Sequence, residues 1–196
     1  MEINKKVIIF TSKKNKKNLK LNLSKYKKLL NLKFIVNEKK LDKCDIFISF
    51  VQGKIISKLN VKKFKTAINF HPAPPTLPGR DPHHWAIYYK KKNYGITIHK
   101  MTTRVDEGKI LFVENFKIKK NDNPQTLRKK SFRLCLNFLK KNFLKIVLGD
   151  YKSSNLKWSK IKKKRADVYK LINGIDNFSI KKQITIKKSF DGFLNN

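Results

Sequence analysis

Residues 66–111 read TAINFHPAPPTLPGRDPHHWAIYYKKKNYGITIHKMTTRVDEGKIL, and all four histidines of the chain lie in this stretch. An apolar run leads into Asn69-Phe70-His71 and stops at Pro72, which is typical of a buried strand that ends abruptly. Alternate residues of a strand face the same side, so we expect Asn69 and His71 to be neighbours at its carboxyl end. Open α/β sheets bind ligands at that edge. The pair therefore marks either a ligand site or a strand end whose polar groups cap loops.

Strand and helix patterns alternate on both sides of this stretch. Short apolar or alternating runs predict strands at 7–10, 33–36, 45–51, 65–70, 94–101 and 109–118. Amphipathic or capped segments predict helices at 16–31, at 55–59, from Asp81-Pro82 through Tyr88, and from Asp122 to Leu148. This alternation predicts an α/β fold of Rossmann-like type, with a mostly parallel sheet flanked by helices in a single domain.

The chain after Gly149 is rich in lysine and weakly patterned. Residues 152–164 are predicted to form a surface loop. A short helix is predicted near 165–172, and a last strand or extended tail near 180–190. Gly149 is expected to end the long helix before this region.

The net charge of +35 raises nucleic acid or an anionic membrane as a partner. Only five of the 48 basic residues are arginines, and arginine is the better reader of phosphates and bases. Lysine, asparagine, isoleucine and phenylalanine share A/T-rich codons, so drift in base composition is the favoured explanation of the charge. We expect nucleic acid not to be the partner, although the field would attract anionic substrates.

The two cysteines, Cys44 and Cys135, lie far apart among apolar residues and lack the spacing of metal ligands. This predicts buried free thiols in a reducing compartment. The chain has no long apolar segment at its start and no run of about 18 apolar residues. We therefore expect no membrane partner and a cytoplasmic location.

Two features argue against a nucleotide-cofactor site and a metal site. The segment after the first apolar run reads TSKKNKKN and contains no glycine, which argues against NAD, FAD or ATP as the ligand there. His83 and His84 are adjacent and would point about 100° apart on a helix. They are expected to be surface residues of the first helical turn near the site rather than metal ligands.

Five short motifs follow one another along the central stretch. They are Asn69-Phe70-His71-Pro72, Leu77-Pro78-Gly79, Trp85-Ala86-Ile87, Gly95-Ile96-Thr97-Ile98-His99 and Val105-Asp106-Glu107-Gly108-Lys109-Ile110. Together they resemble the core signature of the folate-dependent formyltransferases, which include methionyl-tRNA, glycinamide ribonucleotide and nucleotide-sugar N-formyltransferases. The resemblance covers about residues 45–118. It implies a catalytic domain over residues 1–150 and a C-terminal extension over residues 151–196.

The resemblance implies that Asn69, His71 and Asp106 are catalytic, that N10-formyltetrahydrofolate donates a formyl group, and that an amine accepts it. The chemistry suits these side chains. When the amine attacks the formyl carbon, Asn69 and His71 can donate hydrogen bonds to the oxyanion. Asp106, through a water or through His71, can set the charge of the imidazole and move the proton that the amine loses. No metal is needed.

The resemblance also assigns two segments to the pterin site, namely Phe50, Val51, Gln52 and Gly53 after the third strand and Thr102, Thr103, Arg104 and Val105 before Asp106. His99 is interpreted as a structural polar residue at a strand end. The N-terminal half is shorter than in typical relatives by about one β-α unit.

The acceptor is expected to be the amino group of an anionic nucleotide-linked sugar. The residues after Ile118 leave no room for the C-terminal β-barrel of the tRNA-modifying members. The sequence Asn-Phe-His-Pro-Ala-Pro-Pro looks most similar to that of the sugar enzymes, which are commonly homodimers. Three alternatives stay open: an activity like that of methionyl-tRNA formyltransferase, a formyltetrahydrofolate hydrolase, and a non-catalytic basic binding protein on the same scaffold.

Overall fold

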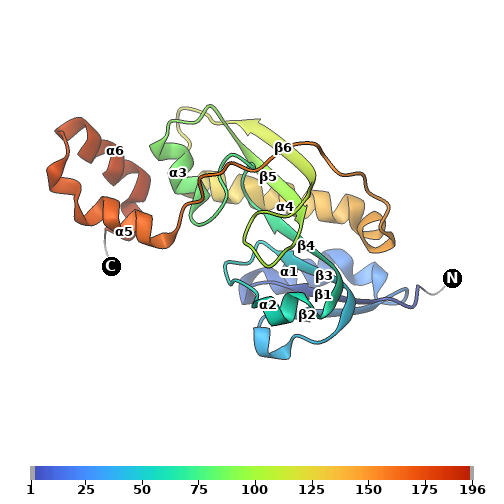
Figure 1. Ribbon diagram of the computed structural model, residues 1–196. Coiled ribbons are helices and arrows are strands. Elements are labelled where there is room, and N and C mark those ends of the chain that lie inside the picture. The colour runs from blue at the N-terminus through green and yellow to red at the C-terminus, as the bar shows by residue number, and fades with distance from the viewer. Residues whose placement is uncertain (1–2, 195–196) are drawn as a thin grey trace.

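A six-stranded sheet runs through the centre of the molecule (Figure 1). The computed structural model describes residues 3–194. The strands lie in the order β2-β1-β3-β4-β5-β6, and their bounds are β1 Lys6–Phe10, β2 Asn31–Ile35, β3 Cys44–Phe50, β4 Phe64–His71, β5 Asn93–Lys100 and β6 Ile110–Lys117. The pairings from β2 to β4 are parallel, and those of β5 are antiparallel. The predicted α/β fold with a mostly parallel sheet is confirmed, as are its six strands.

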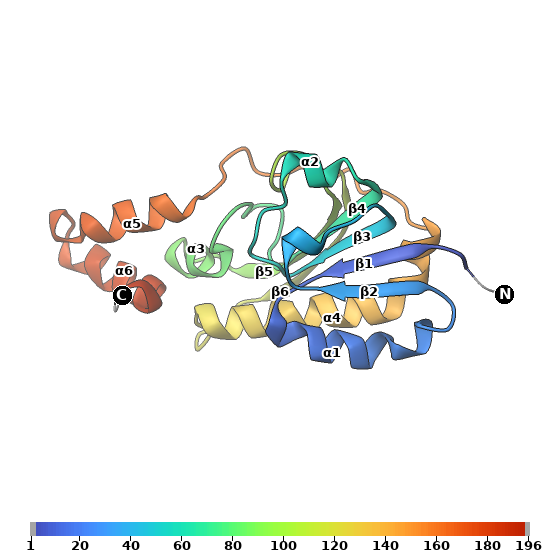
Figure 2. The same cartoon turned by 90° about the horizontal axis from the view of Figure 1, so that it is seen from below.

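Helices cover the two faces of the sheet and one of its ends (Figure 2). Their bounds are α1 Lys13–Leu23, α2 Lys58–Val61, α3 Pro82–Tyr88, α4 Pro124–Leu148, α5 Arg165–Asn173 and α6 Ile180–Phe190. α1 and α4 lie on one face and α2 on the other, whereas α3, α5 and α6 gather at the end away from β2.

Two helices begin at serine caps rather than where the apolar pattern placed them. α1 was predicted over 16–31 but begins after Ser12, whose side chain accepts a hydrogen bond from the backbone N–H three residues on. α2 was predicted over 55–59 but begins after Ser57, which caps it in the same way. Serine is among the preferred N-cap residues because it satisfies a helix donor that has no partner within the helix. α1 ends early because a 3₁₀ turn, Ser24–Tyr26, follows it.

α4 confirms the long helix predicted over 122–148. Asn123 forms a capping box with the residue three positions on, and Gly149 ends the helix with a left-handed φ of 82°. Leu139 and Phe143 are fully buried against the sheet. Each such side chain contributes about 1.5–3 kcal/mol through the apolar area that it removes from water. This helix therefore anchors β4 and β5 from one side.

The two faces of the sheet are covered differently beyond β4. On β5, Ile96 and Ile98 belong to the core beneath α4, so Thr97 and His99 face the other way. On that second face, an extended segment crosses β5 and β6 (Figure 1). This crossing segment, residues 151–164, includes the surface loop predicted over 152–164. It contains no helix or strand, and near its end Lys163 forms an isolated β-bridge with Gly79.

The C-terminal residues form two helices. α5 confirms the helix predicted near 165–172, but the strand or extended tail predicted near 180–190 is wrong, because this stretch is α6. Ile186 and Phe190, four residues apart, are fully buried, whereas Ile184 is 61% exposed. Residues that are four apart lie on the same face of a helix, so this burial pattern has the helical period. Phe190 meets Trp85 of α3 with ring centroids 5.0 Å apart.

The start of α3 also differs from the prediction. Asp81 precedes the helix but has a φ of 54° and makes no side-chain cap. Its carboxylate instead pairs with Arg165, whose Nε lies 2.8 Å from Oδ2 and whose Nη2 donates to Oδ1 at 2.9 Å. His84 donates from Nδ1 to Ser189 O at 2.6 Å and stacks on Phe190. The expectation that His84 lies on the surface near the site is therefore wrong, because it packs against α6.

His83, on the same turn, is half-buried rather than a surface residue. Burial lowers its pKa to about 3, and the charges of His84, Arg128 and Arg165 act in the same direction. His83 therefore stays neutral at ordinary pH.

Both cysteines, Cys44 and Cys135, are buried free thiols, as predicted. Within residues 3–194, none of the helices combines the length and the hydrophobicity needed to span a bilayer.

We expect His83 to make the protein less stable as the pH falls. Its pKa is about 3 in the folded protein and about 6.5 in an unfolded chain, so the unfolded state takes up the proton first. Between these two pH values, the free energy of unfolding of the wild type should fall more steeply than that of His83→Gln, which does not titrate. Urea denaturation near pH 7 and near pH 4 measures the difference. Parallel pH dependences would contradict a buried neutral histidine.

Candidate active site

Four polar side chains meet on the sheet face opposite α4. Asn69 and His71 come from the end of β4, His99 comes from β5, and Asp106 comes from the loop before β6. Asp106 Oδ2 lies 3.6 Å from His71 Nδ1, and its Oδ1 lies 3.5 Å from His99 Nε2. Asn69 Nδ2 lies 3.0 Å from His99 Nε2. We call these four residues the polar cluster.

The sheet register explains why His99 joins the cluster. Asn69 lies directly opposite His99 in the antiparallel pair of β4 and β5. Directly opposed residues of neighbouring strands face the same side. The structure thus brings together Asn69, His71 and Asp106, as the sequence predicted, and adds His99 between two of them. The interpretation of His99 as a structural strand-end residue missed this contact, because the register of the pair is not visible in the sequence.

Two carbonyl groups fix which nitrogen of each imidazole carries hydrogen. His71 Nε2 lies 3.1 Å from Leu77 O, and His99 Nδ1 lies 2.8 Å from Lys100 O. A carbonyl only accepts, so each of these nitrogens is a donor. In a neutral His71 the other nitrogen, Nδ1, is then the basic one, and a proton taken up there would face the Asp106 carboxylate. In a neutral His99, Nε2 accepts from the Asn69 amide, which retains a second N–H for another partner.

Asp106 is ionised in this environment. Burial raises the pKa of its carboxyl, since only 5% of the residue is exposed. The polar contacts with His71 and His99 and the backbone N–H of Gly79 at 2.8 Å outweigh burial and hold the pKa well below its ordinary value. The carboxylate is therefore available to stabilise positive charge on either imidazole.

At two glycines of the sequence motifs, another part of the backbone comes too close for a side chain to fit. Gly79 has a φ of 95°, and a Cβ there would lie 2.3 Å from Lys163 O of the crossing segment. A Cβ at Gly108 would lie 1.6 Å from Lys100 O. Glycine is the residue that accepts both conditions without strain. These positions hold the loops around Asp106 close to the sheet and to the crossing segment.

The sequence interpretation missed Trp158. Its indole Nε1 donates to Gly108 O at 2.8 Å. The centroid of the ring lies 4.9 Å from that of His99 and 5.7 Å from that of His71. A single tryptophan inside a lysine-rich loop was the available signal. The predicted surface loop is therefore a wall of the polar cluster.

The first segment predicted to bind folate lies next to the cluster. Val51 turns the chain after β3 with a φ of 45°, and Gly53 O accepts a hydrogen bond from Arg80. The Phe50 side chain points away into the core, where it meets Phe70. Phe50 is buried, whereas Val51 and Gln52 are half-buried and Gly53 is exposed.

The second such segment runs directly into Asp106. Thr102, Thr103, Arg104 and Val105 are all exposed. Thr102 Oγ1 donates to Arg104 O at 3.0 Å, which closes the loop on itself. The role of both segments in folate binding stays a prediction.

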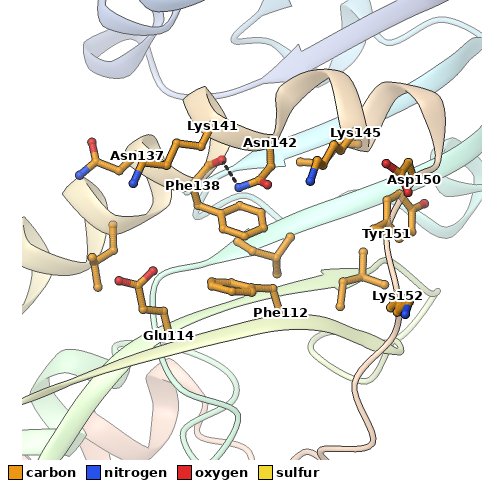
Figure 3. A pocket seen from close by; sticks show the side chains of 14 residues that line it. Phe112, Glu114, Asn137, Phe138, Lys141, Asn142, Lys145, Asp150, Tyr151 and Lys152 are labelled. Atoms are coloured by element: carbon orange, nitrogen blue, oxygen red, sulfur yellow. Dashed lines mark hydrogen bonds between the residues drawn. The ribbon is translucent and has the colours of Figure 1, made fainter.

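Two hollows lie on different sides of this end of the sheet. One, of about 630 Å³, lies between α4, β6 and the turn at 150–152, with Phe112 and Phe138 below lysine side chains (Figure 3). Ile98 lines it, on the face away from the polar cluster. The other, of about 450 Å³, is lined by Leu77 and Pro78 beside the cluster and by residues of α3 and the crossing segment. Within residues 3–194, no three His, Cys, Asp or Glu side chains are arranged to hold a metal ion.

The comparisons with known proteins agree with this geometry. Residues 27–137, more than half of the chain, match the family model described as formyl transferase. The bifunctional polymyxin resistance protein ArnA of Wigglesworthia glossinidia brevipalpis is 34% identical over 144 residues, covering 71% of this chain and 22% of ArnA. The methionyl-tRNA formyltransferase of Prochlorococcus marinus strain MIT 9515 is 32% identical over 137 residues, covering 68% of this chain and 42% of that protein. The chain thus spans less than half the length of these curated relatives.

Solved structures share the fold. A sugar N-formyltransferase from Shewanella sp FDAARGOS_354 superposes with a TM-score of 0.76 at 19% identity, covering 95% of this chain and 87% of that one. The formyltransferase PseJ from Anoxybacillus kamchatkensis, solved with UDP-4,6-dideoxy-4-formamido-L-AltNAc and tetrahydrofolate, superposes with a TM-score of 0.72 at 21% identity. That match covers 92% of this chain and 97% of PseJ.

Gly79→Ala should detach the crossing segment for two reasons. Alanine is strained at the positive φ of this position, and its methyl group would collide with Lys163 O. We expect a loss of more than about 1 kcal/mol in the free energy of unfolding, and faster amide exchange over residues 151–164. The matched control is Gly149→Ala, where φ is also positive, at 82°, but nothing lies within 4 Å of the new Cβ. Equal effects of the two substitutions in denaturation and hydrogen exchange would contradict the close approach at Gly79.

Proposed function

The chain belongs to the formyl transferase family, and we propose that it transfers a formyl group from N10-formyltetrahydrofolate to the amino group of a nucleotide-linked amino sugar. The observation that carries the proposal is the meeting of Asn69, His71 and Asp106 at one point of the sheet, with His99 between Asn69 and Asp106. The donor supplies an activated formyl carbon, to which the amine nitrogen bonds as the bond to N10 breaks.

Asn69 stabilises the charge that develops on the formyl oxygen. It is the least buried member of the cluster, and His99 holds one of its amide hydrogens. The second hydrogen is free to donate to the formyl oxygen. A donor fixed in advance in a site with little water stabilises such charge far better than water does. His99 therefore acts on the reaction through the orientation of Asn69.

His71 takes up the proton that the amine loses. Its Nε2–H is held by Leu77 O, so Nδ1 is the nitrogen that can accept. Asp106 Oδ2, at 3.6 Å from Nδ1, then stabilises the imidazolium, as a buried carboxylate does beside a catalytic histidine. The same proton, passed on through Nδ1 and a water, balances the charge on the departing folate nitrogen.

The residues around the cluster suit a folate. The backbone at Val51, Gln52 and Gly53 and the exposed loop Thr102–Val105 offer hydrogen-bonding groups of the kind that a pterin ring requires. Arg80 ties Gly53 to the loop that carries Gly79, whose N–H meets Asp106. The two segments therefore flank the proposed reaction centre and are connected to it.

A nucleotide-linked sugar is favoured as the acceptor by shape and by charge. The hollow of about 450 Å³ beside Leu77 and Pro78 also contains Tyr89, Lys91 and Lys163. An aromatic ring beside two lysines suits a sugar or base joined to phosphates. The solved structures with a similar fold include sugar N-formyltransferases. Their support for a sugar acceptor is limited to this likeness of fold.

Methionyl-tRNA is the second candidate acceptor. The curated relatives that match the chain include several methionyl-tRNA formyltransferases, and the net charge of +35 would attract RNA. The chain covers only 42% of one such relative. The acceptor therefore has to be tested directly.

The test mixes the purified protein with N10-formyltetrahydrofolate and either nucleotide-linked amino sugars or methionyl-tRNA. Release of tetrahydrofolate and the mass of the acceptor are followed together. We expect a formylated sugar that is absent with His71→Ala. Formylated methionyl-tRNA would select the second candidate, and folate release with no formylated product would identify a hydrolase. Binding of folate with no turnover of any acceptor would contradict the transferase.

Asn69→Ala should lower kcat by about 10²–10³-fold, the usual cost of removing one oxyanion donor. Its KM for both substrates should change little, because the donor acts on charge that develops only during reaction. His99→Gln should have a smaller effect in the same direction, since it disturbs Asn69 only indirectly. Steady-state kinetics with folded variants measures both. An unchanged kcat for Asn69→Ala would remove it from the reaction.

A further inference from the structure

Trp158 is the one large side chain that the crossing segment places on the polar cluster. The segment is attached at both of its ends. Ser154 N donates to Ile110 O at 2.8 Å, Ser159 N donates to Pro75 O at 2.9 Å, and Arg80 N donates to Lys163 O at 2.7 Å. Lys162 forms an ion pair with Glu107 beside Asp106. These bonds hold Trp158 at a fixed height above the sheet.

The indole meets both imidazoles edge to face. Its plane makes an angle of 83° with the ring of His99 and 68° with the ring of His71. Perpendicular contacts of this kind are favourable and set the relative orientation of the rings. The Nε1–H of Trp158 is bonded to Gly108 O, so the indole itself has little freedom to turn.

Hydrogen bonds fix the two imidazoles to different degrees. His99 is bonded at Nδ1 to Lys100 O and at Nε2 to the Asn69 amide, whereas His71 is bonded only at Nε2, to Leu77 O. The final torsion of a histidine side chain has a broad minimum, so the single bond leaves the ring of His71 some rotation about it. The indole removes that rotation from above. It also covers the cluster on the sheet face that α4 leaves open.

We propose that Trp158 is a positioning residue of the formyl transfer, holding the planes of His71 and His99 toward Asp106 and Asn69 and keeping water from the cluster. The inference rests on the proposed function. The indole acts through the two imidazoles and contacts no reacting atom. The C-terminal extension therefore completes the reaction centre.

The kinetic test compares Trp158→Ala with Trp158→Phe and with a matched control, Tyr151→Ala. Tyr151 is an aromatic residue of the same segment, but it lines the hollow on the other face of the sheet. We expect Trp158→Ala to lower kcat by about 10²-fold, the usual effect of small misplacement, with little change in either KM. Trp158→Phe should restore most of the loss, since a ring still covers the imidazoles. Tyr151→Ala should keep the kcat of the wild type.

A purely structural role gives a different result. It would lower the folded fraction, measured by circular dichroism, and leave kcat per folded molecule unchanged in Trp158→Ala. That outcome would overturn the proposal. Equal losses in Trp158→Ala and Tyr151→Ala would overturn it as well, because they would point to the segment rather than to the indole.

A second test does not depend on turnover. The chain has two tryptophans, so Trp85→Phe leaves Trp158 as the only source of indole fluorescence. The emission of an indole depends on the groups packed against its ring, and His99 lies 4.9 Å from Trp158, centroid to centroid. At a fixed pH, we expect the emission spectrum of this protein to change when His99→Ala is added. A spectrum that His99→Ala leaves unchanged would overturn the contact.

The two tests separate the inference from the function on which it rests. No turnover by the wild type with any acceptor would reject the proposed function, while the fluorescence would still show whether Trp158 contacts the imidazoles. Turnover by the wild type, with an unchanged kcat in Trp158→Ala, would reject the positioning role alone.

Discussion

The buried carboxylate of Asp106 is the interaction on which the arrangement of the site depends. It faces His71 and His99 and accepts the backbone N–H of Gly79, so it joins β4, β5 and the proline-rich loop at one point. A buried charge is costly unless several partners compensate it. Each of these segments is therefore held in place by the need to satisfy one anion. The left-handed φ of 48° at Asp106 is the local strain that this arrangement maintains.

The crossing segment closes the same site from outside. α4 covers one face of β4 and β5, whereas on the other face Trp158 lies against the polar cluster. The segment continues into α5, where Arg165 pairs with Asp81 at the start of α3. The packing of the C-terminal helices on α3 thus sets the course of the chain over the cluster. The division at residue 150 stays a prediction, and residues on both sides of it contact one another here.

The errors of the sequence interpretation have physical causes. The apolar pattern misplaced α1 and α2 because Ser12 and Ser57 cap them. The stretch near 180–190 was predicted as a strand or extended tail, although a helix buries Ile186 and Phe190 together against α3. In each case an interaction outside the local pattern selected the element.

The sequence by itself determined the alternation of strands and helices, the shared face of Asn69 and His71, and the motifs that carry Asp106. These depend on residues close together in the chain, where the period of a strand or a cap fixes the geometry. Only the tertiary structure placed His99 and Trp158 in the cluster. His99 enters through the register of an antiparallel pair, and Trp158 through a segment that returns from the far end of α4. Such contacts join distant parts of the chain. Whether they form depends on the free energy of packing those parts together, which no local pattern in the sequence shows.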